Sequence, residues 1–220
     1  DCHFPLRRQG QRCIRASRPA ELETTNTLSD VAVTILCDVP FLSEKAADNL
    51  ARWTSEGGGL LAVPGERAAS AGFYTNWTWK SQAVMPAAWT NFVKSAADTK
   101  PPLFGGASIA GRMLFDEKGM DTNRASVVSR MSDGEPAVVT GAFGRGRIGM
   151  LAMPLDLEWT SLPARPTFVP FAHDVVYSLS ARRSVADTTA LAWNAREGDG
   201  APPTAHETDD LMNRAHHPFA

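Results

Sequence analysis

Residues 31–65 read VAVTILCDVPFLSEKAADNLARWTSEGGGLLAVPG and predict a strand, a helix and a second strand in close succession. Residues 31–37 are apolar without alternation, which is typical of a strand covered on both faces. Ser43 is a suitable N-cap for a helix whose apolar residues recur every 3.6 positions. The three glycines at 57–59 end that helix, and residues 60–63 form the next strand. This order implies two parallel strands joined by a right-handed crossover.

The later part of the chain predicts an antiparallel hairpin followed by a helix. Residues 136–143 and 148–153 are apolar and β-branched, and the sequence Gly-Arg-Gly-Arg between them favours a tight turn. Residues 171–181 have apolar side chains at helical spacing, so this helix is expected to cover one face of the sheet. Together these segments indicate an α/β sheet with a hairpin at one side.

The composition is that of an ordinary globular protein. The chain has 220 residues, of which 43% are hydrophobic and 21% charged, with a formal net charge of −2. Such a chain can bury a core, and its neutrality argues against general nucleic-acid binding, which depends on neutralising phosphates. We predict a domain over residues 1–183 and an acidic, disordered tail containing histidine and proline over residues 184–220. The tail histidines lack ligand spacing, so no metal site is expected.

Several features bear on where the protein resides. No run of about 18 apolar residues occurs, so no membrane span is predicted within this chain. The sequence begins with Asp1, which suggests that it is a fragment or has been processed. Three cysteines without Cys-x-x-Cys spacing make a disulfide framework or zinc site improbable. Cys37, at the end of an apolar run, is interpreted as a buried structural thiol.

Polar residues follow the predicted strands at the edge where α/β sheets bind ligands. Asp38 follows the first strand, and Gly65 and Glu66 follow the second, while Asp156 and Glu158 follow the hairpin. We therefore take these five residues as a candidate ligand crevice. Paired carboxylates could exchange protons with a substrate. The structural alternative is that they cap loops or form ion pairs.

Aromatic residues gather in the irregular region after residue 66. The alternatives for this cluster are the packed core of a capping subdomain and a surface on which sugar rings stack. The candidate contact surface consists of Tyr74, Trp77 and Trp79. A sugar-binding role predicts that at least one of them lies exposed in a groove.

Four segments resemble the class I glutamine amidotransferase-like domain, in the divergent form found in bacterial membrane-anchored proteins of the aerotolerance-regulator and von Willebrand A types. They are residues 33–40 (VTILCDVP), 50–65 (LARWTSEGGGLLAVPG), 133–153 (DGEPAVVTGAFGRGRIGMLAM) and 156–170 (DLEWTSLPARPTFVP). The resemblance covers about residues 4–183. It implies a flavodoxin-like, mostly parallel doubly wound sheet with a β-hairpin and a C-terminal covering helix.

The resemblance also argues against amidotransferase activity. Active members carry a glycine-flanked cysteine after the strand that follows the glycine run, and a His-Pro-Glu motif after a later strand. By motif order, Pro64 stands at the cysteine position, Met153 at the histidine position and Leu155 at the glutamate position. None of these three side chains can act as nucleophile or base, so no catalytic residue is assigned.

We therefore expect a catalytically inactive binding or assembly module of a larger bacterial cell-envelope protein, associated with the inner membrane through flanking segments and requiring no cofactor. Its expected partners are other domains or subunits. One alternative is a hydrolase that uses relocated carboxylates, Asp38, Asp156 and Glu158. The other is a sugar-binding module that uses the aromatic cluster.

Overall fold

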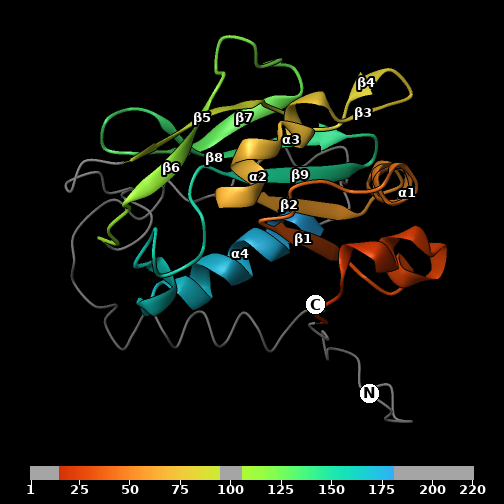
Figure 1. Ribbon diagram of the computed structural model, residues 1–220, viewed down its shortest axis with the longest axis horizontal. Coiled ribbons are helices and arrows are strands. Elements are labelled where there is room, and N and C mark those ends of the chain that lie inside the picture. Colours follow the sequence, from red (N-terminus) through yellow and green to blue (C-terminus); the bar gives the residue numbers. More distant parts are fainter. Residues whose placement is uncertain (1–14, 95–105, 181–220) are drawn as a thin grey trace, which may run out of the picture. The chain divides into compact units, whose positions relative to one another are not determined.

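The computed structural model describes residues 15–94 and 106–180, with no account of residues 1–14, 95–105 and 181–220 (Figure 1). All described residues lie in the first of the two units into which the chain divides, residues 1–188. The predicted tail at 184–220 therefore lies outside the described residues.

The centre of the domain is a five-stranded mixed sheet in the order β1-β2-β9-β8-β7. Strands β1, β2 and β9 are parallel to one another, while β9–β8 and β8–β7 are antiparallel. The strands are β1 Val33–Cys37, β2 Gly59–Val63, β7 Ala125–Arg130, β8 Pro136–Phe143 and β9 Gly146–Leu151.

The predicted flavodoxin-like, mostly parallel doubly wound sheet is wrong, because two of the four strand pairings are antiparallel. The strand–helix–strand unit of the first segment occurs as predicted, and so does the hairpin of β8 and β9. Further parallel strands would each need a long crossover. Here β7, β8 and β9 follow one another through tight turns at Gly134 and Gly144, both with positive φ, and such turns join antiparallel strands.

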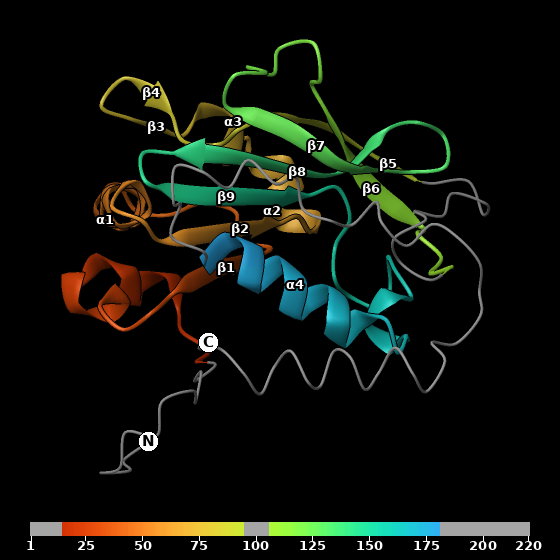
Figure 2. The same ribbon diagram turned by 180° about the vertical axis from the view of Figure 1, so that it is seen from behind.

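Helices α1 (Glu44–Ser55) and α4 (Phe168–Ser180) cover opposite faces of the sheet (Figures 1 and 2). Successive residues of a strand point to opposite faces. At Gly146 an added Cβ would lie 2.0 Å from the Thr54 carbonyl oxygen of α1, whereas at Gly149 it would approach the Leu179 side chain of α4. The odd-numbered residues of β9 therefore face α4.

The start of α1 follows from its sequence. The Ser43 hydroxyl accepts a hydrogen bond from the Ala46 N–H at 3.3 Å, as an N-cap does. The inward face of the helix carries small residues and one leucine, which lets it lie close to the sheet. These buried residues are Ala46, Ala47, Leu50, Ala51 and Thr54.

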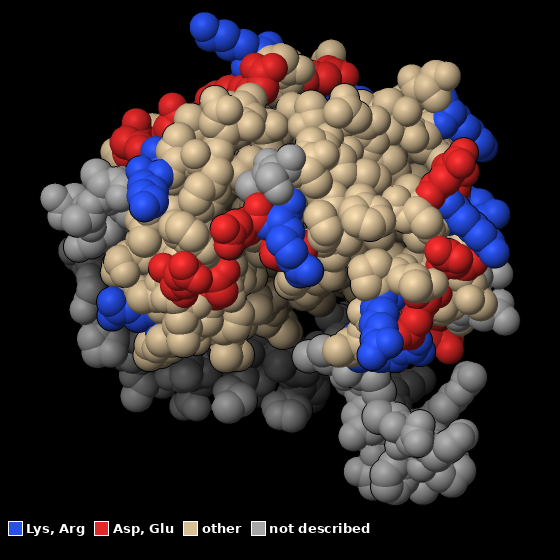
Figure 3. Space-filling view, viewed as in Figure 1, with Lys and Arg blue, Asp and Glu red and all other residues tan. Residues whose placement is uncertain are grey.

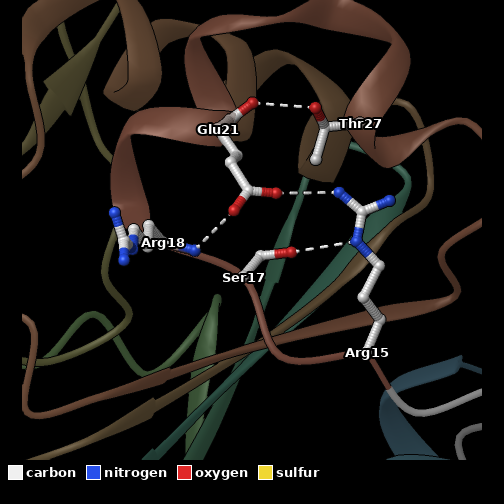
Figure 4. A network of polar contacts seen from close by, with 5 residues as sticks. All are labelled: Arg15, Ser17, Arg18, Glu21 and Thr27. Carbon is white, nitrogen blue, oxygen red and sulfur yellow. Dashed lines mark hydrogen bonds and ion pairs between the residues drawn. The ribbon is translucent and has the colours of Figure 1, made fainter. Parts of the chain in front are cut away.

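Two 3-10 helices, η1 (Pro19–Glu23) and η2 (Thr25–Leu28), precede the sheet. Figure 4 shows the Glu21 carboxylate accepting hydrogen bonds from the Arg15 guanidinium at 2.9 Å and the Arg18 N–H at 3.1 Å. The Arg18 N–H and then Arg15 lower the pKa of Glu21. Asn49 of α1 donates to the Leu22 carbonyl at 3.1 Å, which fixes η1 against the helix.

The long connection between β2 and β7 forms a layer beside the sheet. Two short helices open it, and two separate two-stranded antiparallel sheets follow. Outside this connection, a further 3-10 helix, η4 (Leu162–Ala164), precedes α4. The elements of the connection are α2 Glu66–Ala71, α3 Phe73–Asn76, β3 Thr78–Trp79, β4 Gln82–Ala83, β5 Trp89–Lys94 and β6 Gly111–Phe115.

The contact between β9 and α1 gives a stability prediction. Replacing Gly146 by alanine places a methyl group 2.0 Å from the Thr54 carbonyl oxygen and 2.3 Å from that of Gly58, and both are backbone atoms. We expect Gly146→Ala to lower the free energy of unfolding by about 1–3 kcal/mol in urea titration. Gly149→Ala is the control, because its nearest atom, at 3.1 Å, is the mobile end of the Leu61 side chain. Equal losses for the two variants would contradict this account of the packing.

Candidate functional site

The parallel strands β1, β2 and β9 end at the same edge of the sheet, where the sequence places the candidate crevice. Asp38 immediately follows β1 and has a positive φ of 48°. Its carboxylate accepts one hydrogen bond from the Ala68 N–H at 2.8 Å and another from Arg67 Nε at 2.9 Å. Arg67 Nη2 also donates to the Asp38 carbonyl at 3.1 Å. Asp38 thus binds the first turn of α2.

Gly65 explains why the first turn of helix α2 takes a hydrogen-bond acceptor from the end of strand β1. It is the N-cap of α2 and has no side chain to accept from the free N–H groups of the first turn. The Asp38 carboxylate lies against its backbone, and a Cβ at Gly65 would come within 2.3 Å of the Asp38 Cγ atom. Asp38 and Gly65 are therefore brought together as predicted, in a capping contact. Glu66 is exposed beside them.

The second pair of predicted carboxylates lies in the loop after β9. The Asp156 carboxylate accepts from the Glu158 N–H at 3.1 Å and from the Trp159 N–H at 3.0 Å. This is an Asx turn, in which a side chain orders its own loop. Glu158 is exposed. Among the described residues, no hydrogen bond or ion pair joins Asp38 to either of these carboxylates.

Tyr74 and Trp89 span the ends of the parallel strands. The Tyr74 hydroxyl donates to the Val39 carbonyl at 2.9 Å, just beyond β1, and Trp89 Nε1 donates to the Leu151 carbonyl at 3.1 Å, at the end of β9. Their ring centroids are 4.9 Å apart in an edge-to-face contact. Since β2 lies between β1 and β9, this pair, which we call the aromatic bridge, crosses the edge where a crevice was expected.

The residues at the amidotransferase positions are apolar and withdrawn from water. Pro64 and Met153 are buried, and Leu155 is half-buried. Next to Met153, the Ala152 carbonyl accepts a hydrogen bond from the Met113 N–H of β6 at 2.7 Å. Strand β6 thus supplies a hydrogen-bond partner for the backbone just after β9. Pro64 and Met153 thus belong to the buried interior, and Leu155 lies at its margin.

The predicted aromatic contact surface is mostly interior. Tyr74 and Trp77 are only 2% and 4% exposed, so neither offers a face to a sugar. Trp79 is half-buried; it packs against Phe143, and Lys80 Nζ lies 4.3 Å from its ring centroid. Of the two interpretations of this cluster, the contacts agree with core packing.

Two groups near Asp38 have raised pKa values. Cys37 is exposed, so the prediction of a buried thiol is wrong. The surrounding protein still keeps part of the water from its thiol, and this desolvation, followed by the charge of Asp38, raises the pKa of Cys37. Burial also raises the pKa of Tyr74, with smaller contributions from Asp38 and Cys37. Both groups are therefore neutral at physiological pH. A neutral thiol is a poor nucleophile.

One buried charge was not singled out from the sequence. Arg112 of β6 is 6% exposed and pairs with Asp133, while its Nε and Nη1 atoms have no hydrogen-bond partner among the described residues. Burial would raise the pKa of Asp133, but the hydrogen bond and charge of Arg112 outweigh it and lower that pKa. A lone arginine in the apolar strand GRMLF was the available signal.

The described residues contain no group of three or more histidine, cysteine or acidic side chains that could hold a metal ion. Figure 3 shows lysines and arginines interspersed with acidic residues on the visible face, so neither sign of charge gathers there. In the described part of the chain, no helix has both the length and the apolar character needed to cross a membrane.

No protein-family model and no curated protein matches this sequence. The solved structures that resemble its fold include the following three. The cytoplasmic proteins STM3548 and STM1381 of Salmonella typhimurium are 15% and 16% identical, with TM-scores of 0.54 and 0.51; the matches cover 73% and 71% of this chain, and 76% and 75% of those proteins. Gan42B, a GH42 β-galactosidase from G. stearothermophilus, is 14% identical with a TM-score of 0.50, over 70% of this chain but 22% of the enzyme.

These similarities concern the fold, and they correct one prediction. Association with the bacterial inner membrane is contradicted, because the two structures matched over most of their length are named cytoplasmic proteins. The prediction of a doubly wound fold is also not supported by these similarities, since one of the matched structures is part of a β-galactosidase. The resemblance to amidotransferase-like domains stays a prediction.

The contacts of Asp38 predict a graded response to substitution. Asp38→Ala removes the acceptor for the Ala68 N–H and the partner of Arg67, so we expect the free energy of unfolding to fall by about 1–2 kcal/mol. Asp38→Asn keeps a neutral acceptor and tolerates a positive φ, so it should lose less. Urea titration of both variants measures the difference. A larger loss for Asn than for Ala would contradict the capping role.

The pKa of Cys37 can be read from its alkylation rate. In dilute protein with Cys2 and Cys13 replaced by serine, the rate with iodoacetamide should rise with pH to a midpoint above that of an ordinary thiol. Asp38→Asn removes a negative charge that disfavours the thiolate, so its midpoint should be lower. A wild-type midpoint at or below the ordinary value would contradict the cause assigned here.

Proposed function

We propose that this chain is a non-catalytic binding domain that functions by assembling with another protein chain. The observation that carries the proposal is the aromatic bridge. Tyr74 and Trp89 occupy the edge of the parallel strands at which α/β proteins usually bind their ligands. A substrate at this edge would have to displace two buried rings and leave the Val39 and Leu151 carbonyls without partners.

The hydrogen bonds of Asp38 and Asp156 favour this proposal over the alternative of a hydrolase that uses these carboxylates with Glu158. A general acid or base must be free to exchange a proton with a substrate. Both oxygens of Asp38 accept hydrogen bonds from α2, and Asp156 holds its own loop in a turn. Of the three carboxylates of the hydrolase alternative, Glu158 is the one that is exposed without a side-chain contact of this kind among the described residues.

The burial of the aromatic side chains likewise favours this function over sugar binding. Stacking on a sugar needs an exposed ring face. Tyr74 and Trp77 are buried, and Lys80 lies over the ring of Trp79. The match to part of a β-galactosidase supplies no substrate argument, since at 14% identity it concerns the fold.

Activity assays on the full chain test the proposal. We expect no ammonia release from glutamine and no hydrolysis of p-nitrophenyl esters, phosphates or glycosides above the background given by Cys37→Ala, Asp38→Asn and Glu158→Gln. Glu158→Gln is the matched control for folding, because its exposed carboxylate makes no described side-chain contact, so its unfolding curve should equal that of the wild type.

Two outcomes would overturn the proposal. Ammonia release that disappears in Cys37→Ala would identify an amidotransferase-type nucleophile. Hydrolysis that disappears in Asp38→Asn or Glu158→Gln, in protein that remains folded, would identify a carboxylate-dependent hydrolase.

A further inference from the structure

Strands β1 and β7 form the two edges of the central sheet (Figures 1 and 2). The two edges differ in how they are protected from pairing with another chain. A free strand edge invites pairing with another chain, and proteins commonly prevent this with bulges and charges. At the β7 edge the pairing with β8 is irregular around Ser129. Arg130 of the same strand forms an ion pair with Glu117. The exposed Ser126 is polar. This edge is therefore poorly suited to further pairing.

The β1 edge has none of these protections. Strand β1 (VTILC) pairs with β2 in regular register and contains no charged residue, proline or bulge. Ile35, at its centre, is 45% exposed, which is high for a strand of this composition. Cys37 is also exposed. A mostly apolar, regularly paired edge strand without these protections invites pairing with a further strand.

The backbone of β1 presents unused hydrogen-bonding groups at this edge. The Ala32 carbonyl accepts from the Gly59 N–H, and the Asp38 N–H donates to the Val63 carbonyl. Even-numbered residues thus face β2, and alternation directs the N–H and C=O groups of Val33, Ile35 and Cys37 outward. No hydrogen bond between described residues uses these outward groups.

The charges around β1 fit a second copy of the same strand. A two-fold interface brings a surface against itself, so any net charge on it would be repelled. In an antiparallel pair centred on Ile35, Val33 faces Cys37 of the second copy and Ile35 faces Ile35. Asp38, the nearest charged residue, then falls opposite Ala32, and its charge is paired with Arg67. No like charges meet.

We propose, on the basis of the assembly function above, that β1 binds antiparallel to β1 of a second copy of this chain and extends the sheet across a two-fold axis. The outward N–H and C=O groups of the three odd-numbered residues pair in register, and the exposed Ile35 side chain packs against its symmetry equivalent. A pairing of this size is a weak, reversible interface.

Sedimentation velocity of the full chain over a range of concentrations tests the proposal. The average mass should rise from that of one chain, 23.7 kDa, towards twice this value. Ile35→Lys puts a charge against itself across the axis and should raise the dissociation constant at least tenfold. Ser126→Lys is the matched control, because it adds the same charge to the other edge strand and should leave the constant unchanged.

A disulfide tests the register. With Cys2 and Cys13 replaced by serine, Val33→Cys places a thiol opposite Cys37 of the second copy, and mild oxidation should give a covalent dimer on a non-reducing gel. Adding Cys37→Ser should abolish it. Amide hydrogen exchange needs no substitution: protection of Val33, Ile35 and Cys37 should increase with protein concentration.

The outcomes separate this proposal from the assembly function. A mass of one chain at all concentrations, or a dimer unaffected by Ile35→Lys, overturns the β1 interface. Protection of the three amides in the single chain overturns it too, since another segment of the same chain would then cover the edge. None of these results contradicts the proposal that the domain is non-catalytic. That proposal is tested by the activity assays.

Discussion

Three parallel strands end at one edge of the sheet, and the backbone groups beyond them must find hydrogen-bond partners. In this protein three of those partners come from the long connection between β2 and β7. Tyr74 donates to the Val39 carbonyl, Trp89 to the Leu151 carbonyl and the Met113 N–H to the Ala152 carbonyl. These hydrogen bonds hold the connection over the strand ends. The connection thereby covers the edge at which a ligand crevice was expected.

The same requirement explains the role of Asp38. Helix α2 starts at a glycine that cannot cap it, so its first turn takes an acceptor from the end of β1. The positive φ of Asp38 directs its carboxylate to that turn. A carboxylate at the end of a strand is thereby used for structure, as is the Oδ1 atom of Asp156, which accepts two backbone hydrogen bonds in its own loop. The polar residues Asp38 and Asp156 at the strand ends therefore serve as acceptors for backbone N–H groups.

Close packing of glycines fixes the helices on the sheet. Gly146 lies against the end of α1, while Gly59 admits the Leu179 carbonyl of α4, where an added Cβ would come within 2.6 Å. These contacts determine which residues face each helix. They also leave β1 beyond the full cover of α4, so that Ile35 and Cys37 remain exposed on an otherwise apolar strand.

The sequence by itself determined the local elements: β1, α1 and β2 with the Ser43 cap, the β8–β9 hairpin and α4, because period, caps and turn residues act over a few positions. It also determined that Pro64, Met153 and Leu155 carry no catalytic group. Only the tertiary structure decided that the sheet is mixed, that Tyr74 and Trp89 close the strand ends, and that Asp38 caps α2. These depend on contacts between residues far apart in the chain, such as Trp89 with Leu151, and no local pattern encodes them.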